Sequence, residues 1–278
     1  MLKILLFDMD DVLLDAHGYH RALQDTDSLI ATSMGYENAY LTPDDIAAFE
    51  AVGVTSEWDS SAICASLLLE KAWSVDPQRQ LPIHVTNPPK TKFKIEPPDF
   101  NSFAAAMGET GLKSLRPGER AEGLMLNDAS HLSASQQDTI RKILRGARQI
   151  DGSITHRVFQ ELILGSSEFN QTYKLEPLFD TESYLSKYDR PTLFATQRAL
   201  LIEWLQLPGH SGAILTNRPS RAPRGYFCTP EAEIGAHLVG FESLPIAGFG
   251  GLTWLSHTRG QSQEAYIKPS PVHALTAL

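Results

Sequence analysis

The sequence predicts an α/β fold: a three-layer parallel-sheet (Rossmann-like) core with a large, mostly helical cap. An apolar run at 2–7 has the length of a strand and ends at acidic residues, and a second apolar run at 212–215 ends in Thr-Asn. Helical periodicity fills most of the chain between them. Because connections between sheet elements are normally short, so long an insertion predicts a separate domain. We therefore expect a discontinuous core at 1–15 and 195–278 and a helical cap at 16–194.

The individual elements follow from local signals. The first strand is apolar on both faces, which predicts a buried parallel strand between helices. Thr42 and Pro43 predict the start of a cap helix, as N-cap and first-turn residue. A proline-rich segment at 76–98 is expected to be extended. Farther along, 196–205 is predicted to be a helix. Short strands are predicted at 244–249 and 252–255.

The composition excludes several classes of function. The chain has 278 residues, 42% of them hydrophobic and 21% charged, which is an ordinary globular balance. Its net charge of −9 disfavours a nucleic-acid-binding surface. The opening apolar segment stops at Asp8, too early for a membrane span or a signal peptide. Cys64 and Cys228 match no metal spacing, and two thiols of this kind fit a reducing cytoplasm. We therefore expect a cytoplasmic protein. The charge and the short opening segment lead us to expect no nucleic-acid or membrane partner.

Two acids follow the first strand and are the strongest candidates for chemistry. Asp8 and Asp10 alternate, so they can share one face at the strand's end. Asp8 can attack phosphorus and Asp10 can move the proton of the leaving oxygen. A magnesium ion would bind Asp8 and the main-chain carbonyl of Asp10. The alternative for so short a pattern is an acidic turn.

Two later segments supply the groups that phosphoryl transfer also needs. Thr216 and Asn217 end the strand at 212–215, where a hydroxyl and backbone N–H groups can bind phosphate oxygens. Lys268 can neutralise the phosphate and attract Asp8. Each feature alone also fits a plain strand end or loop.

In this order and at these strand ends, the residues resemble the motifs of the haloacid dehalogenase (HAD) superfamily. Asp8-Met9-Asp10-Asp11-Val12-Leu13 is similar to its first motif, Ile214-Leu215-Thr216-Asn217 to its second and Lys268-Pro269 to its third. The superfamily places a helical cap between its first two motifs. The resemblance implies a magnesium-dependent phosphomonoester hydrolase that acts on a small phosphorylated metabolite through an aspartyl-phosphate.

The chain departs from this pattern in two places. Asp11 replaces the usual glycine after Asp10, which crowds a tight turn and adds a negative charge. The acidic pair of the fourth motif is also missing, because no Asp follows Asp189. We therefore expect a core that is incomplete at its C-terminus, or a degenerate relative. Phosphomutase activity and non-catalytic phosphate binding stay open as alternatives.

The cap offers four candidates for substrate contact. His20 and Arg21 lie near the first motif, and Trp58 and Asp59 belong to Glu57-Trp58-Asp59, which is similar to a cap-helix signature of one subgroup. The alternatives are a solvated helix face for His20 and Arg21, packing for Trp58 and a helix cap for Asp59.

Overall fold

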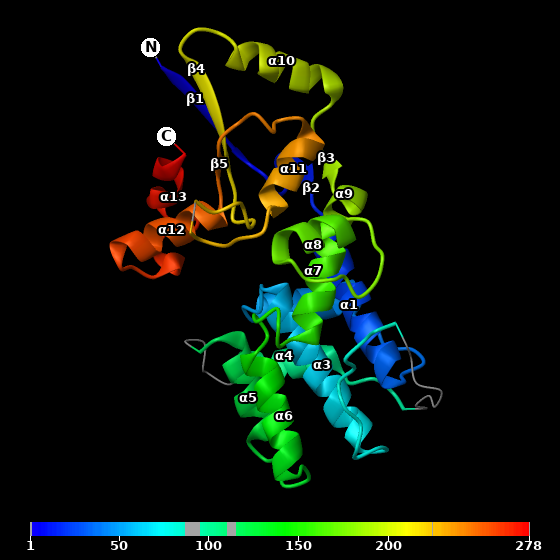
Figure 1. Ribbon diagram of the computed structural model, residues 1–278. Coiled ribbons are helices and arrows are strands. Elements are labelled where there is room, and N and C mark those ends of the chain that lie inside the picture. Colours follow the sequence, from blue (N-terminus) through cyan, green and yellow to red (C-terminus); the bar gives the residue numbers. More distant parts are fainter. Residues whose placement is uncertain (1, 87–94, 110–114, 224, 278) are drawn as a thin grey trace. The chain divides into compact units, whose positions relative to one another are not determined.

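The computed structural model describes residues 2–86, 95–109, 115–223 and 225–277 (Figure 1). The chain forms two compact units: a core unit of residues 1–18 and 183–278, and a helical unit of residues 19–182. The expected domain boundaries, 15/16 and 194/195, stay a prediction. Within the described ranges, no helix combines the length and the apolar composition needed to cross a membrane.

The centre of the core unit is a parallel sheet in the order β1-β4-β5, with β1 at Lys3–Asp8, β4 at His210–Leu215 and β5 at Ile246–Ala247. Strand β1 aligns with β4 from Lys3 opposite His210 to Asp8 opposite Leu215. Both strands therefore end at one edge of the sheet, where ligands of α/β proteins bind.

Short elements complete the core unit around this sheet. Strands β2 (Leu14–Asp15) and β3 (Arg190–Pro191) form a separate antiparallel pair. The helices are α9 (Tyr184–Tyr188), α10 (Ala195–Leu205), α11 (Glu231–Val239), α12 (Phe249–Arg259) and α13 (Pro271–Thr276), with a 3-10 turn at Gln263–Ala265.

The hydrophobic core of this unit forms where α11 packs against the turn after β1. Gly235 of α11 permits this approach, because a Cβ atom there would lie 2.5 Å from the Met9 Sδ atom. The buried members of the cluster are Met9, Leu13, Leu14, Ile214, Ala232, Ala236, Val239 and Phe241. The turn after β1 is therefore anchored by its apolar residues, whereas its acids Asp10 and Asp11 are partly or fully exposed.

Two expectations about the core unit are wrong. Strand β1 is not buried on both faces: Ile4 and Leu6 are each 38% exposed, because among the described residues β1 pairs with β4 alone. The segment 252–255 belongs to α12 and not to a strand. The inward positions of this helix are Gly250, Leu252 and Ser256, and two of these three are too small or too polar to mark a helical stripe in the sequence.

The helical unit is built around α3 (Glu57–Trp73), which is buried along most of its length and packs against α5, α6 and α7. The predicted N-cap at Thr42 is confirmed, since its side chain accepts a hydrogen bond from the Asp45 N–H. The other helices are α1 (Gly18–Met34), α2 (Pro43–Ala51), α4 (Phe100–Glu109), α5 (Pro117–Leu126), α6 (Ala134–Arg145), α7 (Ile154–Leu164) and α8 (Ser166–Tyr173). Pro88 and Pro89 of the proline-rich segment lie outside the described residues.

Candidate active site

Asp8 and Lys268 meet at the carboxyl end of the core sheet. The Lys268 Nζ atom lies 2.5 Å from Asp8 Oδ1, which also accepts a hydrogen bond of 2.8 Å from the Met9 N–H. Lys268 Nζ is also 3.4 Å from the main-chain oxygen of Leu215. The Asp8 side chain is 41% exposed, so a ligand can reach this carboxylate. The structure therefore brings together two of the predicted residues from opposite ends of the chain.

A tight turn after β1 presents Asp10. The N–H groups of Leu13 and Leu14 both donate to the Met9 carbonyl at 2.9 Å, and the Asp11 N–H donates to the Leu14 carbonyl at 2.8 Å. Asp11 has a φ of 59°, in the left-handed region that favours glycine but that aspartate tolerates better than most residues. The turn therefore keeps its shape with Asp11 in the place where the resemblance expects glycine.

The second predicted motif follows β4. Thr216 comes directly after Leu215, the residue that aligns with Asp8. The Thr216 side chain is buried, and its Oγ1 atom accepts a hydrogen bond of 3.0 Å from the Arg218 N–H, which leaves the hydroxyl hydrogen to be donated. Asn217 is exposed. Both residues thus lie at the same edge of the sheet as Asp8.

Arg218 contacts Asp10, and sequence reasoning missed it. Its Nε and Nη2 atoms donate to Asp10 Oδ1 at 2.8 Å and 2.5 Å, and Nη2 lies 2.9 Å from Asp189 Oδ2. The Arg218 and Asp189 side chains are 2% and 0% exposed, and buried charges of this kind are normally paired. The feature of the sequence that could have indicated Arg218 is its position directly after Thr216 and Asn217 at the end of a strand.

His273 of α13 is a second residue that the sequence did not single out. It is fully buried, and its Nε2 atom lies 2.8 Å from the carbonyl oxygen of Ala247 at the end of β5. Burial lowers the pKa of His273, and nearby Lys268 lowers it further, whereas the Ala247 carbonyl and Asp8 oppose the shift. A neutral imidazole that donates to Ala247 anchors α13, and with it the preceding loop that carries Lys268.

The donors at this edge meet part of what a magnesium ion needs. Asp8 offers a partly exposed carboxylate and Asp10 a main-chain carbonyl, whereas Arg218 engages the Asp10 side chain. Over the described ranges, no group of three or more His, Cys, Asp or Glu residues is arranged to hold a metal. This donor set fits Mg²⁺ held through one or two protein oxygens together with waters and a substrate phosphate, and it does not form an all-protein cage.

The predicted cap residues have partners within the helical unit. On α1, the Nε2 atom of His20 lies 3.0 Å from Glu50 Oε1, and Arg21 Nη2 lies 3.1 Å from Asp25 Oδ1. All four side chains are at least partly exposed. These contacts are those of a solvated helix face, and a role in substrate contact stays a prediction.

Trp58 and Asp59 of α3 are engaged more deeply. The Trp58 ring lies 4.8 Å from the His156 ring, and its Nε1–H donates to Gln160 Oε1 at 3.2 Å. Asp59 is buried and its Oδ2 atom lies 2.7 Å from Arg148 Nη2. Trp58 therefore links α3 to α7, and Asp59 links α3 to the segment before α7. A role of either residue in substrate contact stays a prediction.

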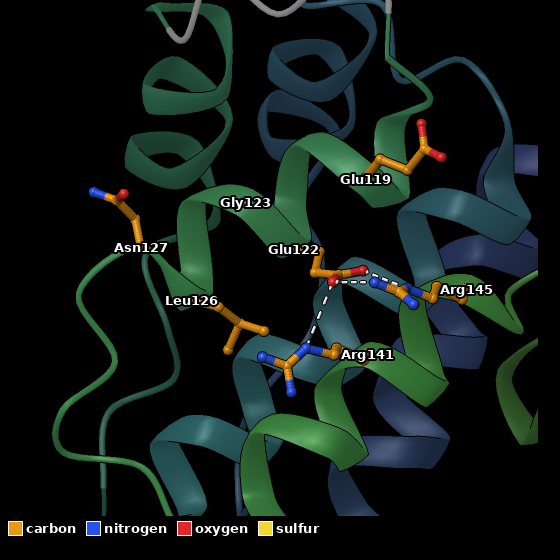
Figure 2. A pocket seen from close by; sticks show the side chains of 7 residues that line it. All are labelled: Glu119, Glu122, Gly123, Leu126, Asn127, Arg141 and Arg145. Atoms are coloured by element: carbon orange, nitrogen blue, oxygen red, sulfur yellow. Dashed lines mark hydrogen bonds and ion pairs between the residues drawn. The ribbon is translucent and has the colours of Figure 1, made fainter. Parts of the chain in front are cut away.

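A separate groove of about 510 Å³ lies between α5 and α6 (Figure 2). Figure 2 shows Glu122 between two arginines: Arg145 Nη2 is 2.6 Å and Arg141 Nε 3.7 Å from its Oε1 atom. The lining residues are Glu119, Glu122, Gly123, Leu126, Asn127, Arg141 and Arg145. Two acids balance two bases here, so the groove has no net charge with which to attract a phosphate.

Comparison with known proteins supports the fold. No family model matches the chain, and no curated protein matches it in sequence. Solved structures that resemble it include an X-ray structure of a Northeast Structural Genomics Consortium target, with a TM-score of 0.63 and 16% identity over 100% of this chain and 77% of the other. Phosphatase Tt82 from Thermococcus thioreducens has a TM-score of 0.52 and 17% identity over 99% and 78%. The predicted fold class, a parallel-sheet α/β core with a mostly helical unit, is confirmed.

Proposed function

We propose that this chain is a magnesium-dependent phosphomonoester hydrolase of the HAD type, which acts on a small phosphorylated metabolite through an aspartyl-phosphate. The observation that carries the proposal is the 2.5 Å ion pair between Asp8 and Lys268, placed where the parallel strands end. The fold likeness to phosphatase Tt82 supports the same reaction class. Cys64 and Cys228 are free thiols, which supports a reducing, cytoplasmic place of work.

The contacts of Asp8 suggest how the first half of the reaction proceeds. Its Oδ1 atom accepts the hydrogen bonds from Met9 and Lys268, so we assign the attack on phosphorus to Oδ2. As the new O–P bond forms, the ester P–O bond breaks and Asp10 gives its proton to the leaving oxygen, which departs as an alcohol. Lys268 and the Thr216 hydroxyl stabilise the negative charge on the phosphoryl oxygens.

The second half returns the enzyme to its starting state. Asp10 takes a proton from water as the water oxygen attacks the phosphoryl group on Asp8. The bond between Asp8 and phosphorus then breaks, inorganic phosphate leaves and Asp10 is protonated again. Bound Mg²⁺, held by Asp8 and the Asp10 carbonyl, would neutralise phosphate charge.

The test is phosphate release from 4-nitrophenyl phosphate with and without Mg²⁺. Asp8→Asn should abolish turnover, because the amide removes the nucleophile, and chelation of Mg²⁺ should suppress it reversibly. Glu242→Gln, the same change at an exposed position of the core unit, should leave the rate unchanged. Full turnover by Asp8→Asn would contradict the assignment of Asp8 as nucleophile.

One observation favours a second candidate, a non-catalytic phosphate-binding protein. The described residues lack a third acid positioned beside Asp8 and Asp10 to complete a metal site. Under this alternative, the wild-type protein would bind inorganic phosphate but release none from any of a panel of phosphate esters. A phosphomutase would instead yield an isomerised phosphate ester in place of free phosphate.

A further inference from the structure

Two segments of the core unit lead to and from the helical unit, and they are bound to each other. Strand β2 pairs with β3, with Asp15 opposite Arg190. One residue before β3, Asp189 Oδ1 accepts hydrogen bonds from the N–H groups of His17 and Gly18 at 3.0 Å and 2.7 Å. Asp189 therefore holds the start of α1 beside the returning chain.

The other oxygen of Asp189 faces Arg218, and Arg218 in turn holds Asp10. The three side chains form a continuous row: Asp189 Oδ2 lies 2.9 Å from Arg218 Nη2, and Arg218 donates twice to Asp10 Oδ1. Two of the three members are almost fully buried, whereas the Asp10 side chain is 41% exposed. The row thus connects two buried charged groups to one accessible carboxylate.

We propose that Arg218 and Asp189 are positioning residues, which fix the Asp10 carboxyl group so that its Oδ2 atom exchanges the proton with the leaving oxygen and then with water. The inference rests on the proposed function and deepens it. Since Arg218 holds Oδ1 with two donors, rotation of the carboxyl group would break both hydrogen bonds. The proton given to the ester oxygen in the first half is regained from water in the second, so Asp10 ends as it began.

The shape of the guanidinium group makes this arrangement sensitive to a conservative change. Arginine presents several N–H donors in a rigid plane, whereas lysine presents one compact ammonium on a flexible stem. Arg218→Lys keeps the buried positive charge between Asp10 and Asp189 but cannot reproduce the contacts of both Nε and Nη2. The expected loss is therefore one of orientation and not of charge.

The test compares two substrates that differ in how much they need a proton donor. Phenyl phosphate has a strongly basic leaving oxygen, whereas 4-nitrophenyl phosphate has a weakly basic one that can depart without protonation. For Arg218→Lys we expect kcat/KM to fall at least about tenfold for phenyl phosphate and less than about threefold for 4-nitrophenyl phosphate. Arg259→Lys, an exposed change at the end of α12, should alter neither.

A second variant protects the test against misfolding of the first. Asp189→Asn keeps a carbonyl oxygen for the N–H groups of His17 and Gly18 and removes the charge that faces Arg218. It should show the same selective loss, with thermal unfolding recorded for each variant. If Asp8→Asn is inactive, equal losses of kcat/KM on both substrates, or no loss on either, would overturn the positioning role and leave the proposed function standing. Full activity of Asp8→Asn would instead overturn the proposed function on which the inference rests.

Discussion

Asp27 of α1 should make the protein less stable as the pH rises from acid to neutral. Its side chain is buried, and neither carboxylate oxygen has a hydrogen-bond partner among the described residues. Burial, reinforced by the negative charge of Asp45, raises the pKa of Asp27 from 3.8 to about 7. Between these two values the unfolded chain loses the proton while the folded protein keeps it, so the free energy of unfolding falls.

The size of the effect follows from the pKa shift. Each pH unit in this range costs about 1.4 kcal/mol, so a shift to about 7 lowers the free energy of unfolding by about 4 kcal/mol at pH 7 and above, relative to pH 4. This is a large share of the 5–15 kcal/mol that is typical of a folded domain.

His156 of α7 opposes this trend over part of the same range. Burial, and then the charge of Arg148, lowers the pKa of His156 from 6.5 to about 4. Between these values the unfolded chain binds a proton that the folded protein does not, so stability rises with pH by about 3 kcal/mol in total. The two residues therefore nearly cancel between pH 4 and about 6.5.

The assay is urea unfolding followed by far-UV circular dichroism at several pH values. Asp27→Asn removes the opposing contribution of Asp27, so the pH dependence that is due to His156 should appear. The free energy of unfolding of this variant should rise by about 1.4 kcal/mol per pH unit from pH 4 to about 6.5. An unpaired buried amide also costs free energy, but equally at every pH, so the slope is the quantity to compare. Glu37→Gln, at an exposed position after α1, is the control. Parallel profiles for Asp27→Asn and the wild type would refute the reasoning.

Two further predictions concern backbone positions in the core unit, and both are measured by thermal or urea unfolding. Gly250→Ala should destabilise the protein by about 1–3 kcal/mol, because its Cβ would lie 2.1 Å from the Ser220 carbonyl oxygen in a packed site. Gly251→Ala on the same helix has no atom within 4 Å of the new Cβ and should be neutral or stabilising, so equal losses would contradict the steric argument. Asp11→Ala should be less stable than Asp11→Gly by about 1 kcal/mol, since φ is 59° there; the reverse order would contradict a left-handed Asp11.

The sequence allowed the main parts of the candidate site to be predicted, because each one lies where a local pattern ends. The strand before Asp8, the strand before Thr216 and the Lys-Pro pair at Lys268 are visible in short windows. The geometry of parallel strands then brings Asp8 and Thr216 to one edge of the sheet, whereas Lys268 reaches Asp8 from a turn. The mostly helical part that accompanies the α/β core was predictable from the long interval of helical periodicity, whereas the expected domain boundaries stay a prediction.

The partners of these residues could not be predicted in this way. Arg218 and Asp10 are separated by 208 positions in the sequence. A local pattern does not indicate which acids of the chain a buried arginine will contact, so the pairing of Arg218 with Asp10 and Asp189 could not be predicted. His273 was missed because a lone histidine in a short helix has no distinctive spacing. The strand predicted at 252–255 failed for a different reason: the helix there turns glycine and serine inward.

The row of ion pairs has an electrostatic consequence for any phosphate that enters. In the state that starts the proposed reaction Asp10 carries a proton, so the charges of Asp8 and Asp189 balance those of Arg218 and Lys268 and the formal charge of this group is zero. A phosphomonoester brings up to about two negative charges. This end of the sheet therefore has no net positive charge to offset that of the ester. A divalent counter-ion would supply it, so catalytic competence should depend on how the ester and the ion arrive together.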